Sequence, residues 1–373
     1  MKQFTLLLSE NFLIKTLGVS ALIGFLVTYF LIPPIIVIAK KLGAVDRPDQ
    51  HRKIHKNPTP RLGGIGIYAG IFTGVLSGVF MLFTGKQKLL LDFSSLLGIL
   101  VGATFILLIG IADDFFSLRP LEKYLGQIAS AFIAIIFGFT ISFVNLPYLG
   151  TLSLGFWSVP VTIFWITAMI NIMNFIDGLD GLAAGVSAIA GTSFLIYLAI
   201  KGNLSLALII ASVVGASLGF LRYNFYPARI FMGDSGSMLL GYLFGVISIN
   251  GVLKSVSAIS LLVPIVVMGV PILDTFLAII RRATAGKPIT EADSKHIHHR
   301  LMHRGLGHKG AVMVIYIWSA FLAFSALMLS FTDSSLLKAV YTLIAFVLTV
   351  GIVSYTGMIE EMRAVLHERK RKK

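Results

Sequence analysis

Short polar segments interrupt an otherwise apolar chain, and they contain the residues that could do chemistry. In one segment asparagine and aspartate recur at every third position, at Asn171, Asn174, Asp177 and Asp180. Amide and carboxylate oxygens at this spacing suit a hard cation or the polar edge of a nucleotide. Asp234 stands in a glycine-rich segment directly before an apolar run, where the backbone N–H groups of a helix start can face an anion. It is the best single candidate for a metal ligand.

Two further segments combine acids and bases. Asp113 and Asp114 follow an apolar run directly, and acids at the C-terminal end of a helix face the unfavourable end of its dipole. This local cost favours a functional role over a simple helix end. Lys123 opens the next apolar run and Lys56 lies before an earlier one. Each lysine alone would be an interfacial anchor, but opposite the acids they supply positive charge for phosphates.

Histidines gather in a third segment, at His296, His298 and His299 beside Arg300. Three imidazoles could hold a structural zinc ion, yet no carboxylate or cysteine stands at ligand spacing beside them. Hydrogen bonding to a diphosphate, or proton transfer, is therefore the favoured interpretation. A solvated loop without a specific role is the alternative.

The composition excludes a soluble protein. Hydrophobic residues make up 56% of the 373 positions and charged residues only 13%, with a mean hydropathy of +0.89, which a single soluble core could not bury. The chain contains no cysteine, so disulfides, thiolate metal sites and cysteine nucleophiles are excluded.

Eleven apolar runs are long enough to cross about 30 Å of hydrocarbon as helices. They are residues 13–39, 62–84, 95–112, 124–144, 157–173, 181–200, 205–221, 237–253, 258–280, 311–331 and 336–357. We therefore expect an all-α polytopic integral membrane protein with about 11 transmembrane helices, the first of them a retained helix. Glycines recur every fourth residue from Gly66 to Gly78 and predict close helix packing there.

Lysine and arginine concentrate in alternate connections, chiefly 40–61 and the histidine-containing loop 281–310, and in a basic tail at 358–373. Basic residues are kept on the cytoplasmic side, so the pattern favours an N-out, C-in orientation. All the polar segments described above then face the cytoplasm. The formal charge of +14 records this orientation rather than nucleic-acid binding, and we expect the tail to bind anionic lipid.

These features together indicate one reaction class. Oxygen ligands for a hard metal, basic groups for phosphates and a position at the lipid boundary are what transfer of a phospho-sugar from a soluble nucleotide to a membrane-embedded phosphate requires. Mg²⁺ would offset the charge of the diphosphate and polarise the bond that breaks.

At these residues the chain resembles the polyprenyl-phosphate N-acetylhexosamine-1-phosphate transferases of glycosyltransferase family 4. The matching motifs run from about Asp46 to His308 and read K-N-P-T-P-R-L-G-G, D-D with a downstream lysine, N-F-I-D-G-L-D-G-L, F-M-G-D-S-G-S and H-I-H-H-R-L. The resemblance is to the bacterial branch that makes undecaprenyl-diphospho-N-acetylglucosamine. The related phospho-muramoyl-pentapeptide transferases have three consecutive histidines, a run that Ile297 interrupts here.

The resemblance implies roles for the acids. Asp234 would bind Mg²⁺, for which Mn²⁺ can substitute, and Asn174 would be a second contact. Asp113 or Asp114 would deprotonate or position the lipid phosphate. Asp177 would shape the site.

It also implies binding roles for the remaining polar residues. Asp180 would lie near the uracil, and Lys56 and Lys123 near phosphates. The remaining ligands of the diphosphate would come from the histidine segment, namely His296, His298, His299 and Arg300. Of these, His298 would also be a catalytic residue.

The implied reaction is UDP-N-acetylglucosamine plus undecaprenyl phosphate giving the lipid-linked diphosphosugar and UMP. It would be carried out by a single transmembrane domain, 1–373, in the bacterial inner membrane, with a homodimer as one compatible assembly. We favour direct attack by the lipid phosphate over a covalent aspartyl intermediate. A muramoyl-pentapeptide-type transferase is one alternative. A secondary transporter is another, and Asp274 is the only acid clearly within an expected span.

Overall fold

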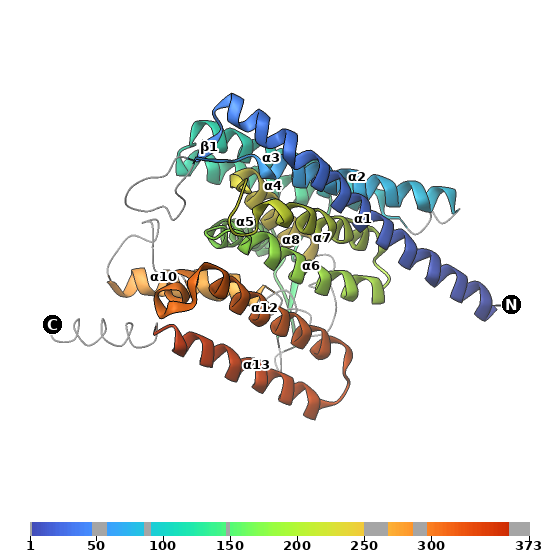
Figure 1. Cartoon of the computed structure of the whole chain (residues 1–373). Coiled ribbons are helices and arrows are strands. Elements are labelled where there is room, and N and C mark those ends of the chain that lie inside the picture. Colours follow the sequence, from blue (N-terminus) through green and yellow to red (C-terminus); the bar gives the residue numbers. More distant parts are fainter. Residues whose placement is uncertain are drawn as a thin grey trace. The chain divides into compact units, whose positions relative to one another are not determined.

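The computed structural model describes residues 2–46, 58–85, 91–146, 150–249, 268–285 and 297–357. Within these residues nearly all regular structure is helical (Figure 1), which confirms the expected all-α class. Contacts divide the chain into two compact units, Met1–Ala258 and Ile259–Lys373, which are described separately below.

Eight α-helices lie in the described residues of the first unit. They are α1 (Lys2–Leu42), α2 (Gly63–Thr84), α3 (Phe93–Phe116), α4 (Pro120–Ile136), α5 (Ser158–Ile176), α6 (Leu182–Ile200), α7 (Leu204–Asn224) and α8 (Gly233–Ser248). Each forms on an apolar run, because a helix satisfies its backbone hydrogen bonds within one segment and needs no water to do so.

Helices α1, α2 and α7 pack closely on one another, and glycines lie at several of their contact points. A Cβ placed on Gly70 would lie 2.6 Å from the Gly24 carbonyl oxygen, and one on Gly215 would lie 1.9 Å from the Ala21 carbonyl oxygen. Only glycine permits backbones to approach this closely. The packing predicted from the glycine repeat of α2 is confirmed.

Helix α8 is the centre of the first unit. It packs against α3 and α5 and also contacts α2 and α4, and every residue from Ser235 to Ser248 is buried. Its N-terminus, which carries Asp234, therefore lies where the ends of several helices meet.

The lengths of the helices test the expected spans. Eight helices of the described residues are long and apolar enough to cross a membrane: α1, α2, α3, α5, α6, α7, α12 and α13. Three further expected spans correspond to helices of only 17, 16 and 17 residues, namely α4, α8 and α10. The count of about 11 spans and the N-out, C-in orientation stay predictions.

The predicted end of the helix over 124–144 is wrong, because α4 stops at Ile136. Gly138 follows with φ +87°, a left-handed conformation that ends helices and favours glycine. The chain then forms strand β3 (Phe143–Leu146), which pairs antiparallel with β4 (Gly150–Ser153) and leads through the short helix η2 (Gly155–Trp157) to α5.

A second strand pair joins α1 to α2. Strand β1 (Val45–Asp46) pairs antiparallel with β2 (Thr59–Pro60), and the Arg61 N–H continues the ladder by donating to the Ala44 carbonyl, 2.9 Å away. The pair fixes the point at which the chain enters α2, close to the segment before α8.

The second unit contains α10 (Gly269–Ala285), α11 (Ile297–Leu301), the π-helical turn η5 (Met302–Leu306), α12 (Gly307–Phe331) and α13 (Ser335–Tyr355). Helix α12 packs against α10, α11 and α13. The expected span 258–280 is described only from residue 268 onward.

Candidate active site

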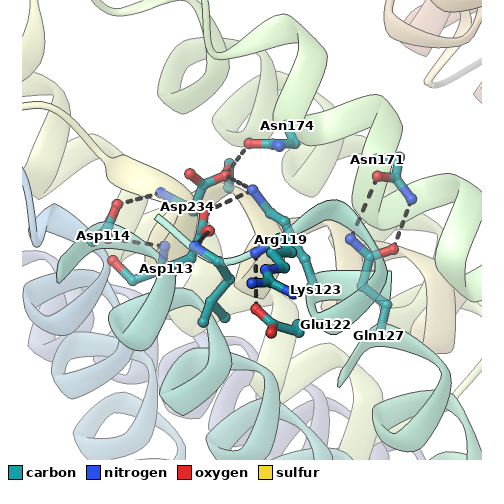
Figure 2. A network of polar contacts seen from close by, with 12 residues as sticks. Asp113, Asp114, Arg119, Glu122, Lys123, Gln127, Asn171, Asn174 and Asp234 are labelled. Carbon is teal, nitrogen blue, oxygen red and sulfur yellow. Dashed lines mark hydrogen bonds and ion pairs between the residues drawn. The ribbon is translucent and has the colours of Figure 1, made fainter. Parts of the chain in front are cut away.

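Lys123 is the centre of a charged cluster at the meeting point of three helices. Its Nζ donates to Asp113 Oδ2 at the end of α3 and to Asp234 Oδ1 at the start of α8, both at 2.7 Å. Figure 2 shows both carboxylates turned toward the ammonium group. Three residues that the sequence analysis singled out separately are thus brought together.

Asp113 also shapes the connection from α3 to α4. Its Oδ1 accepts from the Leu118 N–H at 2.9 Å, while the α4 N-terminus is closed by Glu122, which accepts from the Arg119 N–H at 2.9 Å. Lys123 follows on the first turn of α4, so these bonds fix where its side chain begins.

Asp114 has a different set of partners. Its Oδ1 accepts from the Asp234 N–H at 2.9 Å and its Oδ2 from the Ser235 N–H at 3.1 Å. The anion expected at the start of α8 is therefore a carboxylate of the protein itself. Gly233 has φ +72°, and a Cβ there would lie 2.5 Å from Asp114, so the close approach requires glycine.

The asparagines of α5 lie next to this cluster. Asn174 Oδ1 accepts from the Ser237 hydroxyl on α8 at 2.8 Å. One turn earlier, Asn171 exchanges amide hydrogen bonds with Gln127 of α4, at 2.7 Å and 3.4 Å (Figure 2). Asn171 thus holds α5 to α4, and only Asn174 of this pair adjoins the acids.

Asp177 caps the C-terminus of α5, which ends at Ile176, and its side chain is half-buried. Burial raises the pKa of its carboxyl to about 8, and nearby carboxylates add to this rise. Those neighbours are Asp234, Asp114 and Asp180, whereas the charge of Arg61 acts in the opposite direction. Asp177 therefore lies within the electrostatic reach of the cluster.

Asp180 fixes the turn after α5. Its Oδ2 accepts from the Ala228 N–H at 2.9 Å, and the following Gly181 N–H donates to Asn224 Oδ1 at 3.0 Å. Asn224 in turn donates to the Ile230 carbonyl at 2.9 Å. The regular three-residue spacing is thus divided between a helix and a turn.

Three contributors to the site were not predicted: Gln127, Asn224 and Arg61. Gln127 and Asn224 are buried amides that join separate helices and loops. No local pattern marks them, because their partners lie 44 and 43 residues away. Arg61 belongs to the K-N-P-T-P-R-L-G-G motif, but the motif alone does not indicate a separate role for it.

The histidine segment lies in the second unit. His299 and Arg300 are half-buried on α11, and the backbone of His298 belongs to the same helix. Asp274 of α10, which is buried, accepts from the Ile297 N–H at 2.9 Å and so holds the start of α11. His296 and Lys56 lie outside the described residues.

The chemistry of the described donors is that of an oxygen site. No three histidine, aspartate or glutamate side chains among them gather closely enough to hold a metal ion by themselves. Mg²⁺, however, commonly takes one or two protein carboxylates and completes its shell with water and substrate phosphates. Asp234 and the neighbouring Asn174 fit that smaller requirement.

Comparison with known proteins gives a consistent family. Residues 96–252 match the family model of glycosyl transferase family 4. A probable undecaprenyl-phosphate N-acetylglucosaminyl 1-phosphate transferase from Bacillus subtilis strain 168 is 42% identical, over 92% of this chain and 93% of that protein. A decaprenyl-phosphate N-acetylglucosaminephosphotransferase from Mycolicibacterium smegmatis is 35% identical, over 90% of this chain and 88% of its own.

A phospho-N-acetylmuramoyl-pentapeptide-transferase from Clostridioides difficile strain 630 is 34% identical, over 61% of this chain and 73% of that protein. The similarity is therefore higher, and covers more of the chain, for the two N-acetylglucosamine enzymes. The chain belongs to glycosyl transferase family 4, as one of its polyprenyl-phosphate hexosamine-1-phosphate transferases.

Proposed function

We propose that this integral membrane protein transfers N-acetylglucosamine-1-phosphate from UDP-N-acetylglucosamine to undecaprenyl phosphate. The products are undecaprenyl-diphospho-N-acetylglucosamine and UMP, and the lipid product would begin a cell-wall glycan such as teichoic acid or O-antigen. The observation that carries the proposal is the Lys123 cluster, which joins Asp113 and Asp234 from two other helices. The names of the two N-acetylglucosamine relatives support the acceptor and the sugar.

The charge of the site supports a divalent cation. In the described part of the first unit five carboxylates gather with the cations Lys123 and Arg61; the carboxylates are Asp113, Asp114, Asp177, Asp180 and Asp234. This excess negative charge would repel a donor diphosphate and a lipid phosphate. Mg²⁺ held by Asp234 and Asn174 would offset most of this charge and would stabilise the charge that develops on the phosphate oxygens. Mn²⁺ would be a substitute.

The transfer itself is proposed as direct attack. An oxygen of the lipid phosphate forms a bond to the β-phosphorus of the donor, the bond from that phosphorus to the bridging oxygen breaks, and UMP leaves. A phosphate monoester is already largely dianionic near neutral pH, so Asp113 needs only to orient it or take a residual proton. Lys123 would hold the phosphates in place.

The hydrogen bonds of the paired acids support direct attack over an aspartyl intermediate. Both oxygens of Asp114 accept from backbone N–H groups, and both oxygens of Asp113 accept from the Leu118 N–H or Lys123. A covalent step on either residue would first have to break these bonds.

Other parts of the proposal rest on the motifs. Lys56 and the segment around His296, His298, His299 and Arg300 would bind the diphosphate, and Asp180 would adjoin the uracil. The distribution of lysine and arginine supports a cytoplasmic site.

The test is UMP release by detergent-purified full-length protein supplied with undecaprenyl phosphate and Mg²⁺. UDP-N-acetylglucosamine should be the preferred donor over UDP-N-acetylgalactosamine and UDP-muramoyl-pentapeptide. Lys123→Met should abolish release, whereas Lys201→Met, an exposed lysine after α6, should not. Absence of UMP with every donor would overturn the proposal and favour a transporter.

A further inference from the structure

Arg61 brings a second positive charge to the carboxylates around Lys123. Its guanidinium acts electrostatically on both Asp177 and Asp234. About 30% of its side chain is exposed, so the group is open to a ligand.

The backbone on both sides of Arg61 is fixed beside the start of α8. The Arg61 N–H donates to the Ala44 carbonyl at 2.9 Å, and the Pro60 carbonyl accepts from the Phe231 N–H at 2.8 Å. The Gly63 N–H donates back to the Phe231 carbonyl at 3.2 Å. These bonds place Arg61 next to the segment that leads directly into α8 and its first-turn carboxylate.

Leu62, which follows Arg61, has an unusual backbone conformation. Its φ is +76° and its ψ is 16°, and its side chain is only 2% exposed. A bulky residue in the left-handed region is strained, and it persists only where surrounding contacts impose it. Such conformations concentrate at functional sites. In this protein the left-handed conformation of Leu62 lies at the turn between β2 and α2, directly after Arg61.

The side chain of Arg61 is oriented by an ion pair with Asp46, whose carboxylate is buried. A guanidinium has five N–H donors in a planar fork, and this contact is made through one terminal nitrogen. Within the described residues Asp46 is the hydrogen-bonding partner shown for it, whereas Lys123 already donates to two carboxylates. Arg61 therefore retains N–H donors that can bind a multiply charged anion, and the planar fork of its guanidinium matches the spacing of phosphate oxygens.

We propose that Arg61 is a further substrate-binding residue, whose Asp46-anchored guanidinium donates hydrogen bonds to the diphosphate of the nucleotide-sugar donor. The proposal rests on the proposed function and deepens it. Arg61 binds the phosphorylated part of the donor, and the uridine is recognised by other residues.

The test compares Arg61→Met, Arg61→Lys and Asp46→Asn in full-length protein in detergent. The measurements are the donor KM and kcat for UMP release at saturating lipid phosphate, the inhibition constant of uridine, and the midpoint of thermal unfolding. Asp46→Asn is the matched control, because it removes the charge of the ion pair while the amide oxygen can still accept from the guanidinium and keep it oriented.

Arg61→Met should raise the donor KM by about tenfold or more, equivalent to about 1.4 kcal/mol of lost binding. The inhibition constant of uridine should change by less than about twofold, because uridine has no phosphate. Arg61→Lys should recover part of the loss, since it restores the charge without the fork. Asp46→Asn should lower the unfolding midpoint about as much as Arg61→Met but change the donor KM far less.

Equal KM changes in Arg61→Met and Asp46→Asn would overturn the proposal in favour of a purely structural ion pair. An unchanged donor KM in Arg61→Met, or a matching change for uridine, would also overturn it. In each of these cases the wild-type protein still releases UMP and the proposed function stands. A wild-type protein that releases no UMP would instead overturn the function and this proposal together.

Discussion

Replacing Asp114 should destabilise the protein as well as inactivate it, because its carboxylate joins two helices. Both oxygens accept backbone N–H groups at the start of α8, and the residue is only 7% exposed. In Asp114→Ala both buried donors lose their partner. Asp114→Asn is almost as damaging, since its amide turns an NH₂ group toward one of two donors.

The size of the effect follows from these two bonds. A buried donor left without a partner costs about 1–3 kcal/mol, so Asp114→Ala should lose roughly 2–6 kcal/mol. In a chain of this length, a loss of stability of that size should lower the unfolding midpoint by roughly 5 °C. Asp113→Asn should cost less, about 1 kcal/mol, because its remaining oxygen can still accept from the Leu118 N–H.

The assay is thermal unfolding of the detergent-purified protein without ligand, combined with UMP release. Unfolding of such proteins is commonly irreversible, so all variants are compared at one scan rate. We expect Asp113→Asn to lose activity with a midpoint near that of the wild type, and Asp114→Asn to lose both. An inactive Asp114→Asn with an unchanged midpoint would refute this division of roles and make Asp114 a catalytic group.

Three further predictions concern other acids. Asp234→Asn should abolish turnover chiefly through loss of Mg²⁺ binding, and full activity at ordinary Mg²⁺ would refute the assignment. The pKa of Asp177 is about 8 in the folded protein against 3.8 for the ordinary residue, so the folded state holds a proton that the unfolded chain releases between these values. Stability should therefore fall as pH rises from about 4 to 8. Without metal, Asp177→Asn should flatten this decline in the unfolding midpoint; parallel declines in the two proteins would contradict the explanation. Asp274→Ala should reduce activity more than Asp274→Asn, which keeps an oxygen for the Ile297 N–H, and equal activities would exclude this anchoring role for the hydrogen bond.

The helices could be predicted because a run of about 20 apolar residues leaves the backbone no alternative in hydrocarbon. Their ends were harder to place. Helix α4 stops eight positions before the predicted boundary of 144, at Ile136, because Gly138 takes a left-handed conformation. Apolar residues that follow such a turn extend the hydropathy signal without extending the helix.

The site residues were identified by type, but their partners were not. Asp113 and Asp114 lie at a helix C-terminus, where the helix dipole makes acids locally unfavourable. Four donors compensate that cost, two to each acid, and the two that bind Asp114 lie 120 and 121 residues away in the sequence. No local pattern could show that one of the two acids would cap another helix.

The spacing of three residues from Asn171 to Asp180 was only partly informative. Such spacing predicts a single stripe along one helix, but α5 ends at Ile176, and the Asn171 side chain hydrogen-bonds Gln127. The buried contacts of Gln127 and Asn224 depend on how α4, α5 and α7 pack together. Packing between distant segments is the part of the site that one sequence does not encode locally.

The central claim is that this cluster breaks the diphosphate bond of the donor and moves the phospho-sugar as a unit. The direct measurement uses UDP-N-acetylglucosamine with a radioactive β-phosphate and follows the label after reaction with undecaprenyl phosphate. The label should enter the lipid product, and the released UMP should carry none. Lys123→Met should prevent both the labelling of the lipid and the release of UMP. A label retained in released UDP would mean transfer of the sugar alone and would contradict the account.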